Sequence, residues 1–244
     1  MRDGARHILS ASGRGVSALA ALLALLSGCG GGNNSANIGP PPTTYDLSKA
    51  VAGMVTSGLT ANLTFSGTLS GQSVTGTGTL HAAAGASGTF NGMAAVGQLQ
   101  ALNATITAGG SSAPFASNVV DYYDPTSYDL LGETSSSEYD VASTPIAYPT
   151  SVTGGASGTL GTMSRYTDST MSQSLGTLQL SYQVTAPVDP GSAAGVAFTE
   201  QFFDTSSMLT ETDVLSYSLS SANVLTLVSG SATSGSDVLN FTSP

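Results

Sequence analysis

The sequence predicts a mainly β fold of antiparallel strands, either a sandwich or an open barrel, with one short N-terminal helix. From Leu59 onward, apolar residues alternate with Ser, Thr and Asn at a period of two, as in strands with one buried and one solvated face. Clusters of Gly, Ser, Asn and Asp separate these segments at short intervals. Only 8% of the residues are charged, and Ser, Thr, Gly and Ala are abundant, which suits such sheets. Short strands joined by local turns favour antiparallel pairing.

One segment, residues 45–58, predicts a helix. Its apolar residues follow the i, i+3, i+4, i+7, i+8 spacing of a helical stripe: Leu47, Ala50, Val51, Met54 and Val55. Asp46 is placed to cap its start, and Gly58 to end it. Because the stripe must be buried, we expect the helix to pack on the sheet.

The alternation predicts a first hairpin, with strands at 59–69 and 74–80 joined by a Ser-Gly-Gln-Ser turn. Further strands are predicted at about 99–107, 113–123, 177–185, 196–203, 209–219, 223–229 and 237–242. Residues 93–102 are also compatible with a short helix.

The segment Asp121–Pro149 differs from its surroundings, because its alternation is poor and three prolines interrupt it. It contains six carboxylates and no cation, and we expect a long connection or an irregular edge between two runs of strands. Tyrosine supplies rigid amphipathic contact area. The segment is therefore a hypothetical surface for a protein or a glycan, formed by Tyr122, Tyr123, Tyr128, Tyr139 and Tyr148.

The N-terminus has the features of a secretory signal. Residues 1–15 carry three arginines, and Val16–Leu26 is an apolar run broken only by Ser17. As a helix this run would rise about 16 Å, roughly half of a bilayer core, which is too short for a membrane-spanning segment.

Leu26-Ser27-Gly28-Cys29 follows the apolar run and resembles the lipobox of bacterial lipoproteins at all four positions. The resemblance implies cleavage before Cys29, a diacylglycerol on its thiol and a further fatty acid, such as palmitate, on the new amino group. Two or three acyl chains anchor a protein stably to a membrane. Gly30, where the inner-membrane sorting pattern has Asp, implies the outer membrane, with the protein facing the periplasm or the cell surface.

These features divide the chain into a signal peptide (1–28), a lipidated cysteine with a flexible linker (29–44) and a single β-rich domain (45–244). After cleavage, two basic and fourteen acidic residues remain, a formal net charge of −12. Such a charge repels phosphate backbones and anionic headgroups, so we expect no nucleic-acid partner and membrane attachment only through the lipid. Cys29 is the single cysteine, so no internal disulfide can form.

The sequence contains no recognisable catalytic, metal or cofactor motif. His81 is the single histidine after cleavage, and there is no Gly-x-Ser-x-Gly elbow, zinc-ligand set or EF-hand loop. The carboxylates that could include a hydrolase pair are Asp121, Asp124, Asp129, Glu133, Glu138 and Asp140, but no spacing selects two of them. The lone Arg165 is expected to pair with an acid such as Asp168, or to bind an anionic ligand.

We therefore expect a lipid-anchored envelope protein without enzymatic activity and without a cofactor, acting as a binding or structural module. Its partners would be the membrane, through the lipid, and an envelope protein or glycan. Two alternatives stay open: a carrier of lipid or another apolar ligand in an open barrel, and a carboxylate-dependent hydrolase.

Overall fold

The computed structural model describes residues 43–187 and 192–244. The proposed signal peptide, Cys29 and nearly all of the linker lie outside these residues. Within the described part of the chain, no helix has the length and apolarity needed to cross a membrane.

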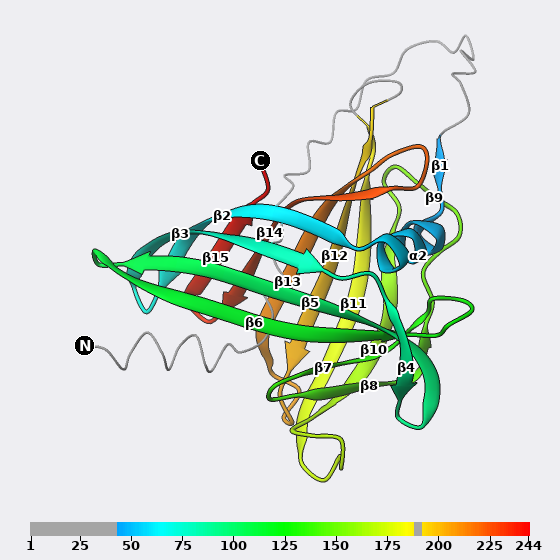
Figure 1. Ribbon diagram of the computed structural model, residues 1–244, viewed down its shortest axis with the longest axis horizontal. Helices are drawn as coiled ribbons and strands as arrows, with labels where there is room; N and C mark the ends of the chain where they lie inside the picture. Colours follow the sequence, from blue (N-terminus) through cyan, green and yellow to red (C-terminus); the bar gives the residue numbers. More distant parts are fainter. Residues whose placement is uncertain (1–42, 188–191) are drawn as a thin grey trace, which may run out of the picture.

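The mainly β prediction is confirmed, and the sheet is a barrel that closes on itself (Figure 1). Its 12 antiparallel strands are β2 (Leu59–Leu69), β3 (Gln72–Ala82), β5 (Met93–Ala108), β6 (Ser111–Tyr123), β7 (Leu130–Ser135), β8 (Tyr139–Ile146), β10 (Ser157–Tyr166), β11 (Ser174–Thr185), β12 (Ala194–Phe203), β13 (Leu209–Leu219), β14 (Leu225–Ser234) and β15 (Asp237–Thr242). Two short strands, β1 (Thr44–Tyr45) and β9 (Val152–Thr153), pair outside the barrel.

Two pairings close the barrel. The last strand, β15, pairs with β2, so the last and the first strands of the barrel are neighbours. On the other side of this first hairpin, β3 pairs with β5 over nine residue pairs, from Val74 opposite Ala108 to Ala82 opposite Gln100. At Gly78 the two strands approach so closely that a Cβ atom would lie 2.5 Å from the carbonyl oxygen of Asn103 and 2.7 Å from the Cβ of Ala104. Glycine at this position therefore permits the closure.

The period-two pattern sets which side chains face inward. On β2, Ala61, Leu63 and Phe65 are buried, whereas Thr60, Asn62 and Thr64 are exposed. The inward apolar residues of the strands form one core cluster, in which Phe65 packs against Phe241 of β15. The outward positions of β2 and β3 carry mainly Thr, Ser and Asn.

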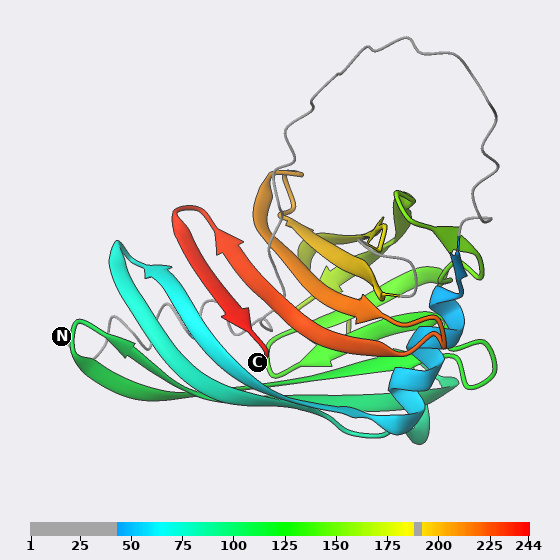
Figure 2. The same cartoon turned by 90° about the horizontal axis from the view of Figure 1, so that it is seen from above.

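The helix prediction is confirmed by α2 (Leu47–Ser57), which lies across one end of the barrel (Figure 2). Asp46 Oδ1 accepts a hydrogen bond from the backbone N–H of Lys49 at 2.9 Å, and the Gly58 N–H donates to the Met54 carbonyl at 2.8 Å. The apolar stripe is buried in the core. We call this the helix end of the barrel.

Backbone hydrogen bonds hold α2 to the neighbouring loops. The Gly85 N–H donates to the Val55 carbonyl at 2.7 Å, and the Leu47 N–H donates to the Pro149 carbonyl at 3.0 Å. The Asp46 N–H donates to Asn223 Oδ1 at 2.8 Å. The opposite end, here called the hairpin end, is formed by the turns at 70–71, 109–110, 136–138, 167–173, 204–208 and 235–236.

The structure corrects the predictions for two segments. Residues 93–102 form the first part of β5 and not a helix, because pairing with β3, β4 and β6 outweighs the helix propensity of Ala, Gln and Leu. Residues 121–149 are not a long irregular connection: they contain the end of β6 and all of β7 and β8. Their inward positions carry Glu133 and Asp140 in place of apolar residues, which hides the alternation.

Two further strands, β4 (Ala86–Phe90) and β10, also went unpredicted. β4 pairs with the beginning of β5 and covers part of the outer face of the barrel. There the Phe90 ring stacks on Tyr122 and Tyr139, with centroids 4.5 Å and 5.0 Å away. This contact forms a second, smaller apolar cluster together with Ala95 and Leu131.

Replacing Gly78 by Ala should destabilise the barrel by about 1–3 kcal/mol, because the added methyl group forces β3 and β5 apart. Gly88→Ala on β4 is the matched control, since no atom lies within 4 Å of the position of its Cβ. Urea unfolding of both variants measures the difference. Equal free energies of unfolding for the two variants would contradict the role of Gly78 in closure.

Candidate functional site

The barrel interior collects acidic side chains. Among the described residues, seven acidic side chains face the interior, and these include all four glutamates of the chain. The seven are Asp121, Glu133, Glu138, Asp140, Glu200, Glu211 and Asp213. Five of them are buried, with 0–8% of their surface exposed, and Glu133 and Glu200 are half-buried. Carboxylates are rarely found at such positions unless they are paired or serve a function.

Strand register places five polar side chains in one row across five neighbouring strands. Gln98 on β5 lies opposite Asp121 on β6, and Asp121 lies opposite Glu133 on β7. The row continues to Asp140 on β8 and ends at Arg165 on β10. Because directly opposed residues of antiparallel strands share a face, all five point into the barrel.

Part of this row borders a cavity of about 80 Å³, which we call the acidic cavity. Its wall contains four carboxylates from β6, β7, the β7–β8 turn and β12: Asp121, Glu133, Glu138 and Glu200. The rest of the wall is formed by Leu63, Leu80, Gln100, Leu102, Ser117, Val119, Ser135, Phe202, Leu215 and Phe241. Since Ser135 and Glu138 belong to the β7–β8 hairpin, the cavity extends toward the hairpin end, away from α2.

Arg165 is the one cation at an inward position in the described chain, and it is 1% exposed. Its Nη2 donates to both carboxylate oxygens of Glu138, at 3.1 Å and 3.0 Å, and its Nε lies 3.5 Å from Asp140 Oδ2. The guanidinium also stacks over the Phe202 ring, 4.9 Å from the centroid. This cation therefore holds two of the seven acids.

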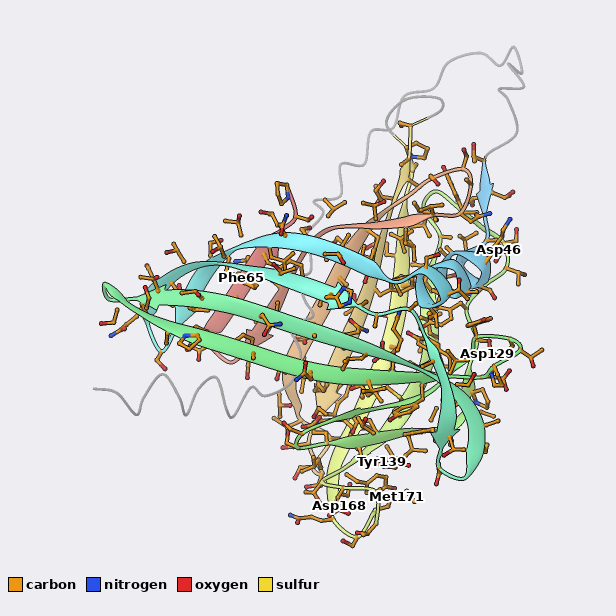
Figure 3. The ribbon with its side chains drawn as sticks, viewed as in Figure 1. Asp46, Phe65, Asp129, Tyr139, Asp168 and Met171 are labelled. Atoms are coloured by element: carbon orange, nitrogen blue, oxygen red, sulfur yellow. The ribbon has the colours of Figure 1, made fainter. Side chains whose placement is uncertain are left out.

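The predicted partner of Arg165, Asp168, was wrong. Asp168 is exposed in the β10–β11 turn, where it accepts hydrogen bonds from the Thr170 N–H at 2.8 Å and the Thr170 hydroxyl at 2.6 Å. Figure 3 shows Asp168 at the hairpin end, and Asp129 near α2. The prediction chose an acid close to Arg165 in sequence. In the barrel, strand pairing instead brings Glu138 and Asp140 next to Arg165.

The electrostatic environment favours the protonated form of two cavity acids. Burial raises the pKa of Asp121 from 3.8 to about 6, although hydrogen bonds from Gln100 and Tyr123 oppose this change. Burial, reinforced by the negative charges of neighbouring acids with Glu200 the largest, raises the pKa of Glu133 well above its usual 4.5. The interior is therefore a region of strong negative potential in which carboxylates compete for protons.

Ser117 on β6 also faces the cavity. It is 8% exposed, and its Oγ has no hydrogen-bond partner within residues 43–187 and 192–244. A buried hydroxyl that makes no hydrogen bond costs about 1–3 kcal/mol. Its position on the wall means that a molecule in the cavity can supply the missing partner.

The five tyrosines of the predicted surface are not brought together. Tyr122 and Tyr139 stack on Phe90 on the outer face. Tyr123 is buried inside the barrel, and its hydroxyl donates to Asp121 Oδ2 at 3.2 Å. Tyr148 packs edge-on against Phe198, and Tyr128 packs against the core beside a loop at the helix end.

The structure offers no arrangement for a metal site or for histidine chemistry in its described part. No group of three or more His, Cys, Asp or Glu side chains there is placed to hold a metal ion. His81 lies on the outer face of β3, exposed, with Nδ1 3.0 Å from the Thr60 hydroxyl. Of the acids predicted as hydrolase candidates, Asp124 lies on the outside in the β6–β7 loop, where it accepts hydrogen bonds from Thr126 and Ser127.

Sequence reasoning missed three interior acids, Glu200, Glu211 and Asp213. A signal for them exists: Glu200 sits between Phe198 and Phe202, and Asp213 precedes Leu215, on the buried parity of their strands. In a strand with alternating pattern, an acid at a position where apolar residues are otherwise found predicts a carboxylate inside the barrel.

Replacing Arg165 by Met should cost about 3–5 kcal/mol of stability at pH 7.5, because Glu138 and Asp140 lose their buried cation. Lys49→Met, which removes an exposed cation from α2, is the control and should change stability by less than about 0.5 kcal/mol. Urea unfolding at pH 7.5 measures the effect of both substitutions, and a loss at Arg165 no larger than at Lys49 would contradict the role of the buried cation.

The raised pKa of Asp121 predicts a specific dependence of stability on pH. Between pH 3.8 and about 6 the folded protein retains a proton that the unfolded chain has lost, so stability present below pH 3.8 disappears as the pH rises through about 6. Relative to the wild type, Asp121→Asn should therefore gain up to about 3 kcal/mol between pH 4 and 7.

The control for this effect is Asp168→Asn. Hydrogen bonds from Thr170 hold the pKa of Asp168 below its usual 3.8, so its carboxylate is ionised in both states above that range and the difference between this variant and the wild type should stay almost constant between pH 4 and 7. Denaturant unfolding over a pH series measures both. A constant difference between Asp121→Asn and the wild type would contradict the burial effect.

Comparison with known proteins does not extend this description. No protein-family model matches the chain, and neither the curated proteins nor the solved structures give a match. The acidic cavity, with Arg165 and Ser117 beside it, is thus the site that the chain's own geometry provides.

Proposed function

We propose that this protein is a lipid-anchored envelope protein without enzymatic activity, which holds a small ligand inside its barrel. The observation that carries the proposal is the acidic cavity, whose wall presents four carboxylates together with an unsatisfied buried hydroxyl. A concave site with a few convergent polar groups on an apolar wall is the usual form of a ligand site.

The N-terminal sequence supports the location. The match of Leu26-Ser27-Gly28-Cys29 to a lipobox supports acylation of Cys29, and the following Gly-, Asn- and Pro-rich residues are suited to a spacer. A tether of this kind would keep the barrel at the membrane surface while leaving it in the aqueous phase of the envelope.

The size of the cavity favours a small polar ligand over a lipid. At about 80 Å³ it is well below the roughly 300–1,000 Å³ of pockets that take drug-sized molecules. The four carboxylates would also oppose an acyl chain, because a desolvated acid without a polar partner is costly. The carrier of apolar ligands is therefore the weaker form of this proposal.

A carboxylate-dependent hydrolase is a second candidate, favoured by one specific observation. Asp121 and Glu133 are direct cross-strand neighbours that both border the cavity, and the pKa of each is raised. An acid with a raised pKa beside other carboxylates is the arrangement that general acid–base catalysis uses. We place binding first because a cavity of this size has no groove for a polymeric substrate.

The location is tested with Cys29→Ser, expressed beside the wild type in a bacterium that makes lipoproteins. The wild type should incorporate a clickable fatty acid and fractionate with membranes, whereas the variant should do neither. Label in the variant equal to that in the wild type would contradict the anchor.

Binding is tested by native mass spectrometry of the full chain, purified from envelopes in detergent. The wild type should carry an additional small mass, and Val119→Phe, which fills the cavity, should lose it. Val120→Phe, on the opposite face of β6, is the matched control and should keep it. A wild type without any bound small molecule, or with the same mass in Val119→Phe, would contradict the site.

A further inference from the structure

We infer that the acidic cavity binds a short aliphatic diamine, an organic cation whose two ammonium groups are joined by methylenes. This inference rests on the proposed function, since it names the ligand class of the same cavity. It follows from the charge, the layout, the buried hydroxyl and the size of the cavity.

The first argument is charge. Among the described residues that line the cavity there are four carboxylates and no Lys, Arg or His. Arg165 lies outside this lining and is committed to Glu138 and Asp140. At low dielectric, a positive charge placed among such acids is attracted far more strongly than in water. The ligand that this wall favours is therefore cationic.

The second argument is layout, which favours an organic cation over a metal ion. Calcium needs six to eight oxygen ligands at about 2.3–2.6 Å, and the described acids do not form such a group. Asp121 and Glu133 are cross-strand neighbours on β6 and β7, whereas Glu200 stands on the non-adjacent strand β12. Acids on non-adjacent strands can each face one end of a ligand that carries two positive charges.

The wall has two chemically different sides. The carboxylates belong to β6, β7, the β7–β8 turn and β12, whereas β2, β3 and β15 contribute Leu63, Leu80 and Phe241. An aliphatic chain can pack against these apolar residues while its ammonium groups face the acids. A bare metal ion or a fully hydrated cation would leave the apolar side without a contact.

The third argument is Ser117, which is independent of the acids. Its Oγ faces the cavity, is buried and makes no hydrogen bond within the described residues. A hydroxyl has two acceptor lone pairs, and an ammonium group has three N–H donors, more than one carboxylate can accept. The ammonium group near Asp121 can therefore donate to Ser117 as well.

Size limits the length of the chain. At about 30 Å³ per water molecule in the liquid, a volume of 80 Å³ corresponds to roughly three water molecules. A four-carbon diamine is somewhat larger than this and would reach from Asp121 toward the hairpin end, while a long polyamine would lie mostly outside the cavity. We therefore take 1,4-diaminobutane as the probe.

The test is calorimetric titration of the full-length, detergent-solubilised protein at pH 7.5, after exhaustive dialysis. 1,4-Diaminobutane should bind, n-butylamine should bind at least tenfold more weakly, and 1,4-butanediol should not bind. Glu133→Gln and Glu200→Gln should each weaken diamine binding at least tenfold, and Ser117→Ala several-fold. Asp129→Asn, in the β6–β7 loop outside the cavity, is the matched control and should bind as the wild type does.

Thermal unfolding of each variant separates loss of binding from loss of folding, and Ser117→Ala provides a variant without any change of charge. Equal affinity for butanediol and the diamine, or tighter binding of calcium, would overturn the inference. If native mass spectrometry finds a bound molecule that is not an amine and the diamine does not bind, the ligand class is wrong while the proposed function stands. If the cavity holds no molecule in either experiment, both are wrong.

Discussion

Closure of the sheet is the constraint on which the remaining features depend. Once β15 pairs with β2 and β3 pairs with β5, every second side chain of each strand must face a shared interior. Apolar side chains at most of these positions supply the core, and the glycines of β3 allow the strands to meet. The same alternation places inside the barrel every acid at an inward-facing position of a strand, although the desolvation of its carboxylate costs free energy.

Six of the seven interior acids stand on strands and follow this alternation, whereas Glu138 enters from the β7–β8 turn. Arg165 compensates Glu138, whose two carboxylate oxygens both accept from its Nη2, and Asp140, through a second ion pair. Asp121 instead accepts hydrogen bonds from Gln100 and Tyr123, and its burial raises its pKa to about 6. The interior thus contains both the ion pairs of Arg165 and acids whose pKa is raised by their surroundings. Under the proposed function, a bound ligand would change the protonation of the second group.

The sequence was sufficient to predict those elements whose signals come from residues close together in the chain. Asp46 and Gly58 fixed the limits of the helix, and alternation located most strands, because both signals depend on neighbouring residues. It was insufficient for β7 and β8, whose inward positions carry Glu133 and Asp140 and so lack the apolar alternation. It also could not pair Arg165 with Glu138, 27 residues away, because that contact exists only after the strands are in register. The tyrosine surface looked continuous in sequence, yet β6 turns Tyr122 and Tyr123 to opposite faces.

Under the proposed lipid anchor, the position of α2 also decides which end of the barrel the tether joins. The chain enters the barrel through this helix, which hydrogen bonds fasten to the loops around Gly85, Pro149 and Asn223. A tether attached ahead of Thr43 would therefore be joined to the helix end of the barrel. The hairpin end, with Glu138 just inside it, lies opposite this point of attachment.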